Sequence, residues 1–302
     1  MIQSPLNYTG GKYKLLPQIF PLFPKDIGCF VDLFCGGCNV GINVSAEKYV
    51  FNDISEPLIN LLSTMAQMDT NLFKEKVDFY ISAFGLSDSK KKGYSFYCCD
   101  SSKGLASYNR DKYYNLRLRF NSNVDKNDDY YVMLFVLIIY AFNNQIRFNS
   151  SNQFNLPPGK RDFNAKIENK LISFLNQLHS KNIVFRCDDF RAFNIDNLTS
   201  SDFVYADPPY LITCASYNEQ RGWTEKDETD LLQFLDSLTE KNIRFALSNV
   251  LESKSKKNNI LCNWIEKRPD YVVHALKFSY SNANYQRQKK NEKTKEVLIT
   301  NY

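Results

Sequence analysis

Short apolar runs, each followed by a turn or by an amphipathic segment, recur near both ends of the chain. Ile27 to Asp32 and Tyr49 to Asn52 predict two strands, and the spacing from Pro57 to Met65 predicts a helix. Between the two strands the chain turns at glycines and is then rich in apolar residues up to Ala46, which predicts another helix. This order of strand, loop, helix, strand and helix indicates an α/β sheet with parallel strands.

The alternation stops in the middle of the chain and then returns. From about residue 69 to residue 172, Tyr, Asn, Lys and Arg crowd together and strands no longer alternate with helices. Further strands are predicted at Ile183 to Arg186, Phe203 to Ala206, Arg244 to Leu247 and Val297 to Thr300, with a helix at Glu225 to Leu238. We therefore predict one α/β domain from residues 1–68 and 173–302, with a second domain, residues 69–172, inserted into it.

Composition narrows the class of protein. With 302 residues, 43% of them hydrophobic and 24% charged, the chain can bury a core and is not disordered as a whole. The longest apolar stretch, Val132 to Phe142, is far shorter than the roughly 20 residues of a membrane-spanning helix, so we expect no contact with a membrane. Eight cysteines without regular spacing are typical of reduced thiols and predict a cytoplasmic protein. The net charge of +5 suits a polyanionic partner but does not identify one.

The most informative residues are Asp207-Pro208-Pro209-Tyr210, which follow the predicted strand Phe203 to Ala206. Ligands of open α/β sheets bind at the carboxyl ends of the strands, so chemistry is expected here. The prolines fix the backbone and leave the Asp207 carboxylate and the Pro208 carbonyl as acceptors beside an aromatic ring. Two acceptors that hold the hydrogens of a planar amine favour a pyramidal nitrogen able to attack. A simple turn that ends a strand remains the alternative for the tetrapeptide alone.

A second group of residues follows the first predicted strands. Gly36 and Gly37 let the backbone approach a ligand closely, and Asp53 is placed to accept hydrogen bonds from ribose hydroxyls. Asp32 and Asp189 add two more carboxylates at strand ends, which suits a cationic, hydroxyl-bearing ligand. Each aspartate taken alone is more often a helix cap or a turn former.

Two other site classes are rejected. The segment Tyr8 to Lys12 lacks the spacing of a phosphate-binding loop, which argues against a nucleoside triphosphatase. Cys35 and Cys38 form one C-x-x-C pair without a second pair, and the chain has only two histidines, so we expect no metal site.

Nine segments of the chain, taken together and in order, resemble the motifs of Dam-like DNA adenine-N6 methyltransferases. They are Tyr8-Thr9-Gly10-Gly11-Lys12, Phe30 to Gly37, Asn52-Asp53-Ile54, Phe142-Asn143 with Arg147-Phe148-Asn149, Gln153 to Pro157, Asp189-Phe190, Asp207 to Tyr210, Ser248-Asn249 and Glu296 to Tyr302. The resemblance spans essentially the whole chain. It implies a Rossmann-like S-adenosylmethionine-dependent methyltransferase sheet in which residues 69–172 form a mainly helical target-recognition domain.

The resemblance also implies which residues bind the cofactor and the target base. The residues that would contact S-adenosylmethionine are Tyr8, Lys12, Asp32, Phe34, Gly36, Gly37, Cys38, Asp53, Asp189, Phe190 and Asp207. Asp207, Pro208, Pro209 and Tyr210 would act on an adenine that is flipped out of the duplex, with Tyr210 stacking on the base. Cys38 departs from the family, because this loop position is usually Gly, which puts the loop geometry in doubt. No metal is needed for methyl transfer from a sulfonium.

Double-stranded DNA would be contacted by Asn7, Phe142, Asn143, Arg147 and Asn149. An arginine at position 147 favours a bidentate contact to guanine. Asn7 replaces a lysine that relatives methylating GATC usually carry, and Leu211 to Trp223 lacks the pattern of those enzymes. We therefore predict a short palindromic site with adenine and at least one guanine, other than GATC; CATG is compatible. Phosphate contacts would come from Lys103, Arg110, Lys112, Arg117, Arg119 and the run from Arg287 to Lys295.

Several alternatives remain open at this stage. The same sheet could methylate another planar amine, such as cytosine N4, although relatives of that kind more often begin the tetrapeptide with Ser or Asn. The chain could also be a DNA-binding relative that has lost catalysis. The resemblance points to a restriction-modification system of the bacterial cytoplasm and nucleoid; a cognate restriction endonuclease would act without a stable complex, and the sequence does not decide whether one exists.

Overall fold

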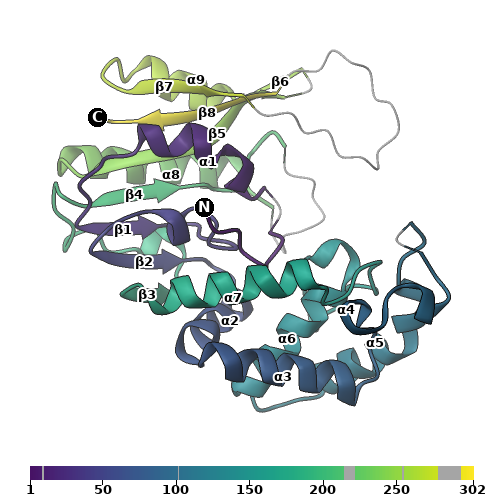
Figure 1. The fold of residues 1–302 in the computed structure, drawn as a ribbon. Helices are drawn as coiled ribbons and strands as arrows, with labels where there is room; N and C mark the ends of the chain where they lie inside the picture. The colour runs from purple at the N-terminus through teal and green to yellow at the C-terminus, as the bar shows by residue number, and fades with distance from the viewer. Residues whose placement is uncertain (9, 101, 214–221, 254, 278–293) are drawn as a thin grey trace. The chain divides into compact units, whose positions relative to one another are not determined.

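The computed structural model describes residues 1–8, 10–100, 102–213, 222–253, 255–277 and 294–302, which form two compact units (Figure 1). The helical unit consists of Met1–Gly11, Gly36–Asn43 and Ser55–Lys181, and the sheet unit consists of Lys12–Cys35, Val44–Ile54 and Asn182–Tyr302. Each unit consists of three separate chain segments, whereas the prediction placed only two boundaries, at residues 69 and 172. Which part recognises DNA stays a prediction.

The sheet unit contains every strand found in the described part of the chain. Its parallel strands are β1 (Cys29–Asp32), β2 (Lys48–Asn52), β3 (Ile183–Arg186), β4 (Phe203–Ala206) and β5 (Arg244–Ser253). β8 (Lys295–Thr300) runs antiparallel between β5 and β7 (Val272–Leu276), and the two-residue β6 (Lys256–Lys257) pairs with β5. The order across the sheet is β3-β2-β1-β4-β5-β8-β7 (Figure 1). The predicted α/β class with a mostly parallel sheet is confirmed.

Side-chain alternation gives the sheet two covered faces. One face carries Val31 and Val204 and packs in one buried cluster with apolar residues of α8 (Glu225–Glu240) and α9 (Asn259–Glu266). On the other face, Phe30, Phe203 and Tyr205 pack around Phe23, whose ring centroid lies 4.8 Å from that of Phe203. Phe23 directly follows η1 (Lys12–Leu15), α1 (Leu16–Ile19) and η2 (Phe20–Leu22). We call this second side the η1 face, since η1 delivers Lys12 to it.

The helical unit is built around its most apolar helix. The helices are α2 (Glu56–Gln67), α3 (Thr70–Ala83), α4 (Ser89–Lys92), α5 (Ala106–Asn121), α6 (Asp128–Tyr140) and α7 (Ala165–His179). Every residue of α6 from Tyr130 to Tyr140 is buried, because α2, α3 and α5 all pack against it. The longest apolar run of the sequence is therefore a core helix, and no helix in the described residues is long and apolar enough to cross a membrane.

One predicted element is wrong. The apolar segment before Ala46 forms only a short 3-10 helix, η3 (Gly41–Asn43), instead of an α-helix. Asn39 accepts a hydrogen bond from the backbone N–H of Ser4 at 3.0 Å, and Asn43 accepts one from that of Ile2 at 2.6 Å. Asparagine side chains that bond to backbone in this way compete with a regular helix, and here they fix the N-terminal segment instead.

Candidate active site

Asp207 lies at the carboxyl end of β4, where it forms an ion pair with Lys12. The Lys12 ammonium is 2.8 Å from the Asp207 carboxylate, and the exposed fractions of the two side chains are 3% and 18%. The lysine also lies 4.8 Å from the centroid of the Tyr210 ring. Lys12 and Tyr210, both predicted site residues, are therefore gathered around the predicted catalytic carboxylate in the sheet unit.

Glu296 is a further member of this group that the sequence analysis did not assign a role. It begins the buried part of β8, is 2% exposed, and lies 3.7 Å from the Lys12 ammonium. The Tyr210 hydroxyl is 3.0 Å from Asp207 Oδ1 and 3.2 Å from Glu296 Oε1, within donating distance of both. The neighbouring Val297 packs in the α8 cluster, so alternation along β8 turns Glu296 toward the η1 face.

The environment of Asp207 opposes its negative charge. Burial raises the pKa of this carboxyl above its ordinary value, while the Lys12 ammonium and the Tyr210 hydroxyl lower it and the Glu296 charge raises it. Tyr205, two residues earlier on β4, is fully buried, and its hydroxyl is 2.8 Å from that of Ser248. Burial raises the pKa of Tyr205 well above its ordinary value. A carboxylate that is poorly hydrated and held by specific donors is the pattern found at many catalytic sites.

Asn52 joins the carboxyl ends of three strands. Its side-chain amide donates to the carbonyls of Leu33, after β1, and Asp188, after β3, both at 3.0 Å, and it accepts from the Asp188 N–H at 3.0 Å. The Cys35 N–H in turn donates to the Asn52 carbonyl at 2.8 Å. Asn52 therefore sets the relative positions of the segments that carry Phe34, Asp53 and Asp189. Its role was missed because its partners are distant in sequence.

Two predicted cofactor carboxylates are buried at adjacent strand ends. Asp32 ends β1 with 2% exposure, and Asp53 follows β2 with 7% exposure. Phe34 follows β1 and the buried Phe190 follows Asp189; their ring centroids are 5.6 Å apart, and both rings contact Trp223. Carboxylates together with an aromatic cluster fit a cationic ligand that carries hydroxyls and a planar base.

Asp189 has a structural task in the described residues. It is the N-cap of η6 (Phe190–Ala192), where its side chain accepts from the Arg191 N–H at 2.9 Å. Arg191 also pairs with Asp189, Asp227 and Asp230 at distances of 3.1, 2.6 and 2.7 Å. Asp189 therefore acts as a helix cap, the alternative considered for each aspartate in the sequence. Its contact with a cofactor remains a prediction.

The glycine loop lies in the helical unit together with Tyr8. Gly36 has a φ of +47°, and a Cβ atom there would come within 2.9 Å of the Tyr8 ring. Only glycine meets both conditions without strain. Cys38, in the position that is usually Gly, has a φ of 57°, the left-handed region that glycine favours. A cysteine at this position therefore adopts a backbone conformation that is strained for a residue with a Cβ atom. Cys38 is also fully buried.

The predicted DNA-contacting residues come together in a hairpin-like loop of the helical unit. Bridges from Ala141 to Pro158 and from Phe148 to Phe154 close the loop. The Asn7 side chain donates to the Asn143 carbonyl at 2.7 Å, which joins two segments predicted to face DNA. Phe142 is 51% exposed, whereas Arg147 donates through Nε to the Asn155 side chain at 2.8 Å. The Asn149 side chain accepts from the backbone N–H groups of Ser151 and Gln153, so it shapes the tip of the loop.

Some predicted phosphate contacts have partners within the protein. Arg117 donates to the Leu156 carbonyl at 3.0 Å, and the Lys112 ammonium lies 3.2 Å from the centroid of the Tyr108 ring. Lys103 and Arg110 are exposed. Residues 287–293 of the basic run and residues 214–221 of the stretch from Leu211 to Trp223 lie outside the described residues.

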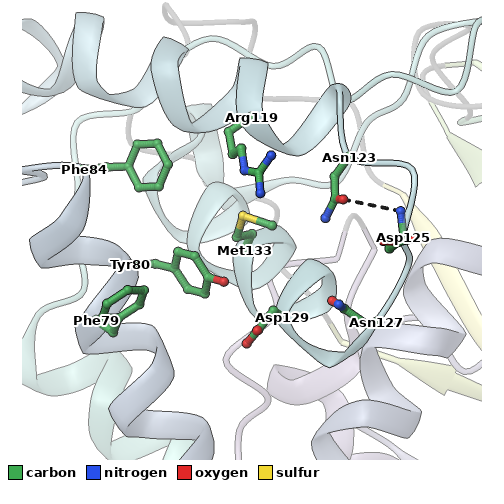
Figure 2. Close-up of a pocket in the computed structure, with 9 residues that line it drawn as sticks. All are labelled: Phe79, Tyr80, Phe84, Arg119, Asn123, Asp125, Asn127, Asp129 and Met133. Carbon is green, nitrogen blue, oxygen red and sulfur yellow. Dashed lines mark hydrogen bonds between the residues drawn. The ribbon is translucent and has the colours of Figure 1, made fainter.

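A pocket of about 370 Å³ opens in the helical unit between α3, α5 and α6 (Figure 2). Its lining is Phe79, Tyr80, Phe84, Arg119, Asn123, Asp125, Asn127, Asp129 and Met133. Asp129 is held by Lys76 at 2.6 Å. Of the residues singled out from the sequence, Arg119 lines this pocket, so the predicted site residues and the pocket are different features. Within the described part of the chain, no cluster of three or more His, Cys, Asp or Glu residues could hold a metal ion.

Comparisons with known proteins identify a family. The family described as D12 class N6 adenine-specific DNA methyltransferase matches residues 8–288. The type II methyltransferase M.FokI of Planomicrobium okeanokoites is 41% identical and the modification methylase StsI of Streptococcus sanguinis is 40% identical, each over the whole of this chain and 43% of the relative. The DNA adenine methylase of Escherichia coli K12 is 26% identical over 81% of this chain and 79% of its own. The chain thus spans less than half the length of the first two relatives.

Proposed function

The chain belongs to the D12 class of N6 adenine-specific DNA methyltransferases, and from this premise we propose that it transfers a methyl group from S-adenosylmethionine to N6 of an adenine in double-stranded DNA. The observation that carries the proposal is the buried ion pair of Asp207 and Lys12 at the end of β4, beside Tyr210. A held carboxylate next to an aromatic ring is what a planar exocyclic amine requires.

The residues at the strand ends fit the cofactor. Asp32 and Phe34 would line its methionine part, Asp53 would hold the ribose hydroxyls, and Phe190 would contact its adenine. Tyr8, Lys12, Gly36, Gly37, Cys38 and Asp189 are the other residues proposed to contact it. When bound, S-adenosylmethionine supplies a methyl group on a sulfonium centre, which is already activated for transfer. We propose no metal in the reaction.

The protein's own part in the reaction is orientation and charge placement. The Asp207 carboxylate and the Pro208 carbonyl would accept from the two hydrogens of the target amine, which leaves the nitrogen lone pair directed at the methyl group. Tyr210 would stack on the base, and Pro209 would keep the backbone rigid. As the new bond forms, the amine acquires positive charge, and the Asp207 carboxylate stabilises that charge and is placed to accept a proton from it.

The exposed ring of Phe142 supports a role of residues 69–172 in DNA recognition. Phe142 and Asn143 start the loop closed at Ala141 and Pro158, and apolar side chains that enter a base stack help to extrude a base. Arg147 and Asn149 would lie at the same surface as Asn7. We propose that the enzyme is the modification component of a bacterial restriction system, acting in the cytoplasm without a stable complex with an endonuclease.

The test is methyl transfer by the purified protein to unmethylated plasmid, followed by single-molecule sequencing of the product. We expect N6-methyladenine in one short sequence context, and the same reads report the context and whether one strand or both are modified. Asp207→Asn is the matched control, because it keeps the shape of the side chain and removes its charge. Methylated cytosine, or no transfer by the wild-type protein, would refute the proposal.

A further inference from the structure

Glu296 is a buried carboxylate with no assigned role. It pairs across the sheet with Val250 of β5 and Leu276 of β7, both of which are apolar and buried. A carboxylate is stable in such a place only when charged or hydrogen-bonding partners accompany it. The partners that surround its Oε1 are Lys12 and Tyr210, the same two residues that hold Asp207.

We propose that Glu296 is a positioning residue for the Asp207 carboxylate, which it controls through the shared Lys12 ammonium and the shared Tyr210 hydroxyl. The inference rests on the proposed function, because it assigns a task at the same site. Glu296 would hold both donors on the η1 face, while its own negative charge competes with Asp207 for them.

The competition follows from counting charges and hydrogens. Two carboxylates share the Lys12 ammonium, and the one hydrogen of the Tyr210 hydroxyl lies within donating distance of both. The Lys12 ammonium is closer to one carboxylate than to the other: it lies 2.8 Å from Asp207 but 3.7 Å from Glu296. Asp207 therefore receives the stronger ion pair, and Glu296 acts on it mainly as a nearby negative charge.

The pKa of Asp207 should respond to each neighbour with a definite sign. Burial and the Glu296 charge raise it, whereas Lys12 and the Tyr210 hydroxyl lower it. The titratable groups on this side of the sheet include Tyr205, which is neutral near pH 7, and Asp32, whose charge also acts on Tyr205; His274 of β7 and Tyr302 lie there too, beside Thr300 and Phe203. Removing the charge of Glu296 should thus lower the pKa of Asp207, and removing the Tyr210 hydroxyl should raise it. A purely structural role of Glu296 predicts the upward shift in the Tyr210 variant but not the downward shift when the Glu296 charge is removed.

The experiment is a titration of the Asp207 carboxyl, followed by carboxyl ¹³C NMR in the full chain and assigned with Asp207→Asn. Glu296→Gln removes the charge at constant size, and Tyr210→Phe removes the hydroxyl and keeps the ring. Glu252→Gln is the control, because Glu252 forms an exposed ion pair with Lys295 on the same two strands, at 2.9 Å. We expect the Asp207 midpoint to move to lower pH in Glu296→Gln, to higher pH in Tyr210→Phe, and to stay unchanged in Glu252→Gln.

Turnover gives a second measurement. We expect Glu296→Gln to lower kcat at least fivefold, to change KM for S-adenosylmethionine less than twofold, and to shift the acidic limb of kcat to lower pH. An unchanged Asp207 midpoint in Glu296→Gln would overturn the inference, whatever the shift in Tyr210→Phe, as would wild-type kcat in Glu296→Gln. If Glu296→Gln does not fold, Glu296→Asp gives the second test, because it keeps the charge but draws it back from the shared donors; a lower Asp207 midpoint supports the inference and an unchanged one overturns it. A wild-type protein without methyl transfer would refute the proposed function, while the NMR titration would still test the coupling.

Discussion

Replacing Asn52 by alanine should weaken both the fold and cofactor binding. The substitution removes two hydrogen bonds donated to the carbonyls of Leu33 and Asp188 and one accepted from the Asp188 N–H, each 3.0 Å long. A hydrogen bond contributes roughly 1 kcal/mol, and a buried group left without a partner costs about 1–3 kcal/mol. Because Asn52 is 1% exposed, water cannot easily replace it. We expect a loss of about 3–4 kcal/mol in the free energy of unfolding.

The effect on the cofactor follows from where these bonds lie. Asn52 fixes the segments after β1 and β3, which carry Phe34 and Asp189, so its loss should let both move. We expect the affinity for S-adenosylmethionine to fall about tenfold, equivalent to roughly 1.4 kcal/mol. Urea unfolding and isothermal titration calorimetry measure the two effects.

Asn301→Ala is the matched control. Asn301 also makes three hydrogen bonds, to Thr239, Ile243 and Phe245, but beside the amino end of β5. It should lower stability and leave cofactor affinity unchanged. Two results would refute the role of Asn52 in positioning the strand ends. One is an unchanged urea midpoint of unfolding in Asn52→Ala, and the other is equal affinity of both variants for the cofactor.

Three further predictions concern single side chains. Asp53→Ala should weaken S-adenosylmethionine binding by about 1.5–3 kcal/mol, the usual contribution of hydrogen bonds to a charged group, while DNA binding measured by fluorescence anisotropy persists; unchanged calorimetric affinity would remove Asp53 from the site. Arg147→Ala should cost roughly 1–3 kcal/mol of discrimination at one base pair, whereas an equal loss on all DNA sequences would identify a phosphate contact. For Asp78, burial raises the pKa, but Lys74 and Lys90 outweigh it and the net shift is downward. This ion pairing therefore stabilises the fold above about pH 4 and is lost as pH falls further, so Asp78→Asn should cost about 1 kcal/mol near pH 7 and nothing near pH 2 in urea titrations.

Much of the sheet could be predicted from the sequence. The bounds of β3 and β4 agree with the prediction, because short runs of aromatic and β-branched residues between turns have few other solutions. The segment before Ala46 was predicted wrongly, because its local pattern says nothing of the backbone groups of Ile2 and Ser4 that its asparagines bind.

The candidate site divides in the same way. Asp207 and Tyr210 could be found because a distinctive tetrapeptide follows a strand. Glu296 could not be assigned a role, because it comes close to Lys12 and Tyr210 only when β8 pairs with β5 in the sheet. Asn52 likewise depends on Asp188, 136 residues away. Candidate residues that stand in a distinctive local motif can therefore be predicted from sequence, whereas those defined only by sheet topology cannot.

The position of β4 beside β1 has a consequence for how the protein is made. The Asp202 carboxylate accepts from the Cys29 N–H across 173 residues of chain, and the registers of β1 and β4 are fixed at the same place. Pairings of such long sequence separation close late in folding. On the ribosome, β1 and β2 must therefore wait with both outer edges unpaired while the helices of the helical unit are synthesised, because β3 and β4, their partners, come later in the chain. An exposed strand edge is prone to aggregation, so slower translation or higher temperature during expression should reduce the soluble yield before it affects the folded protein.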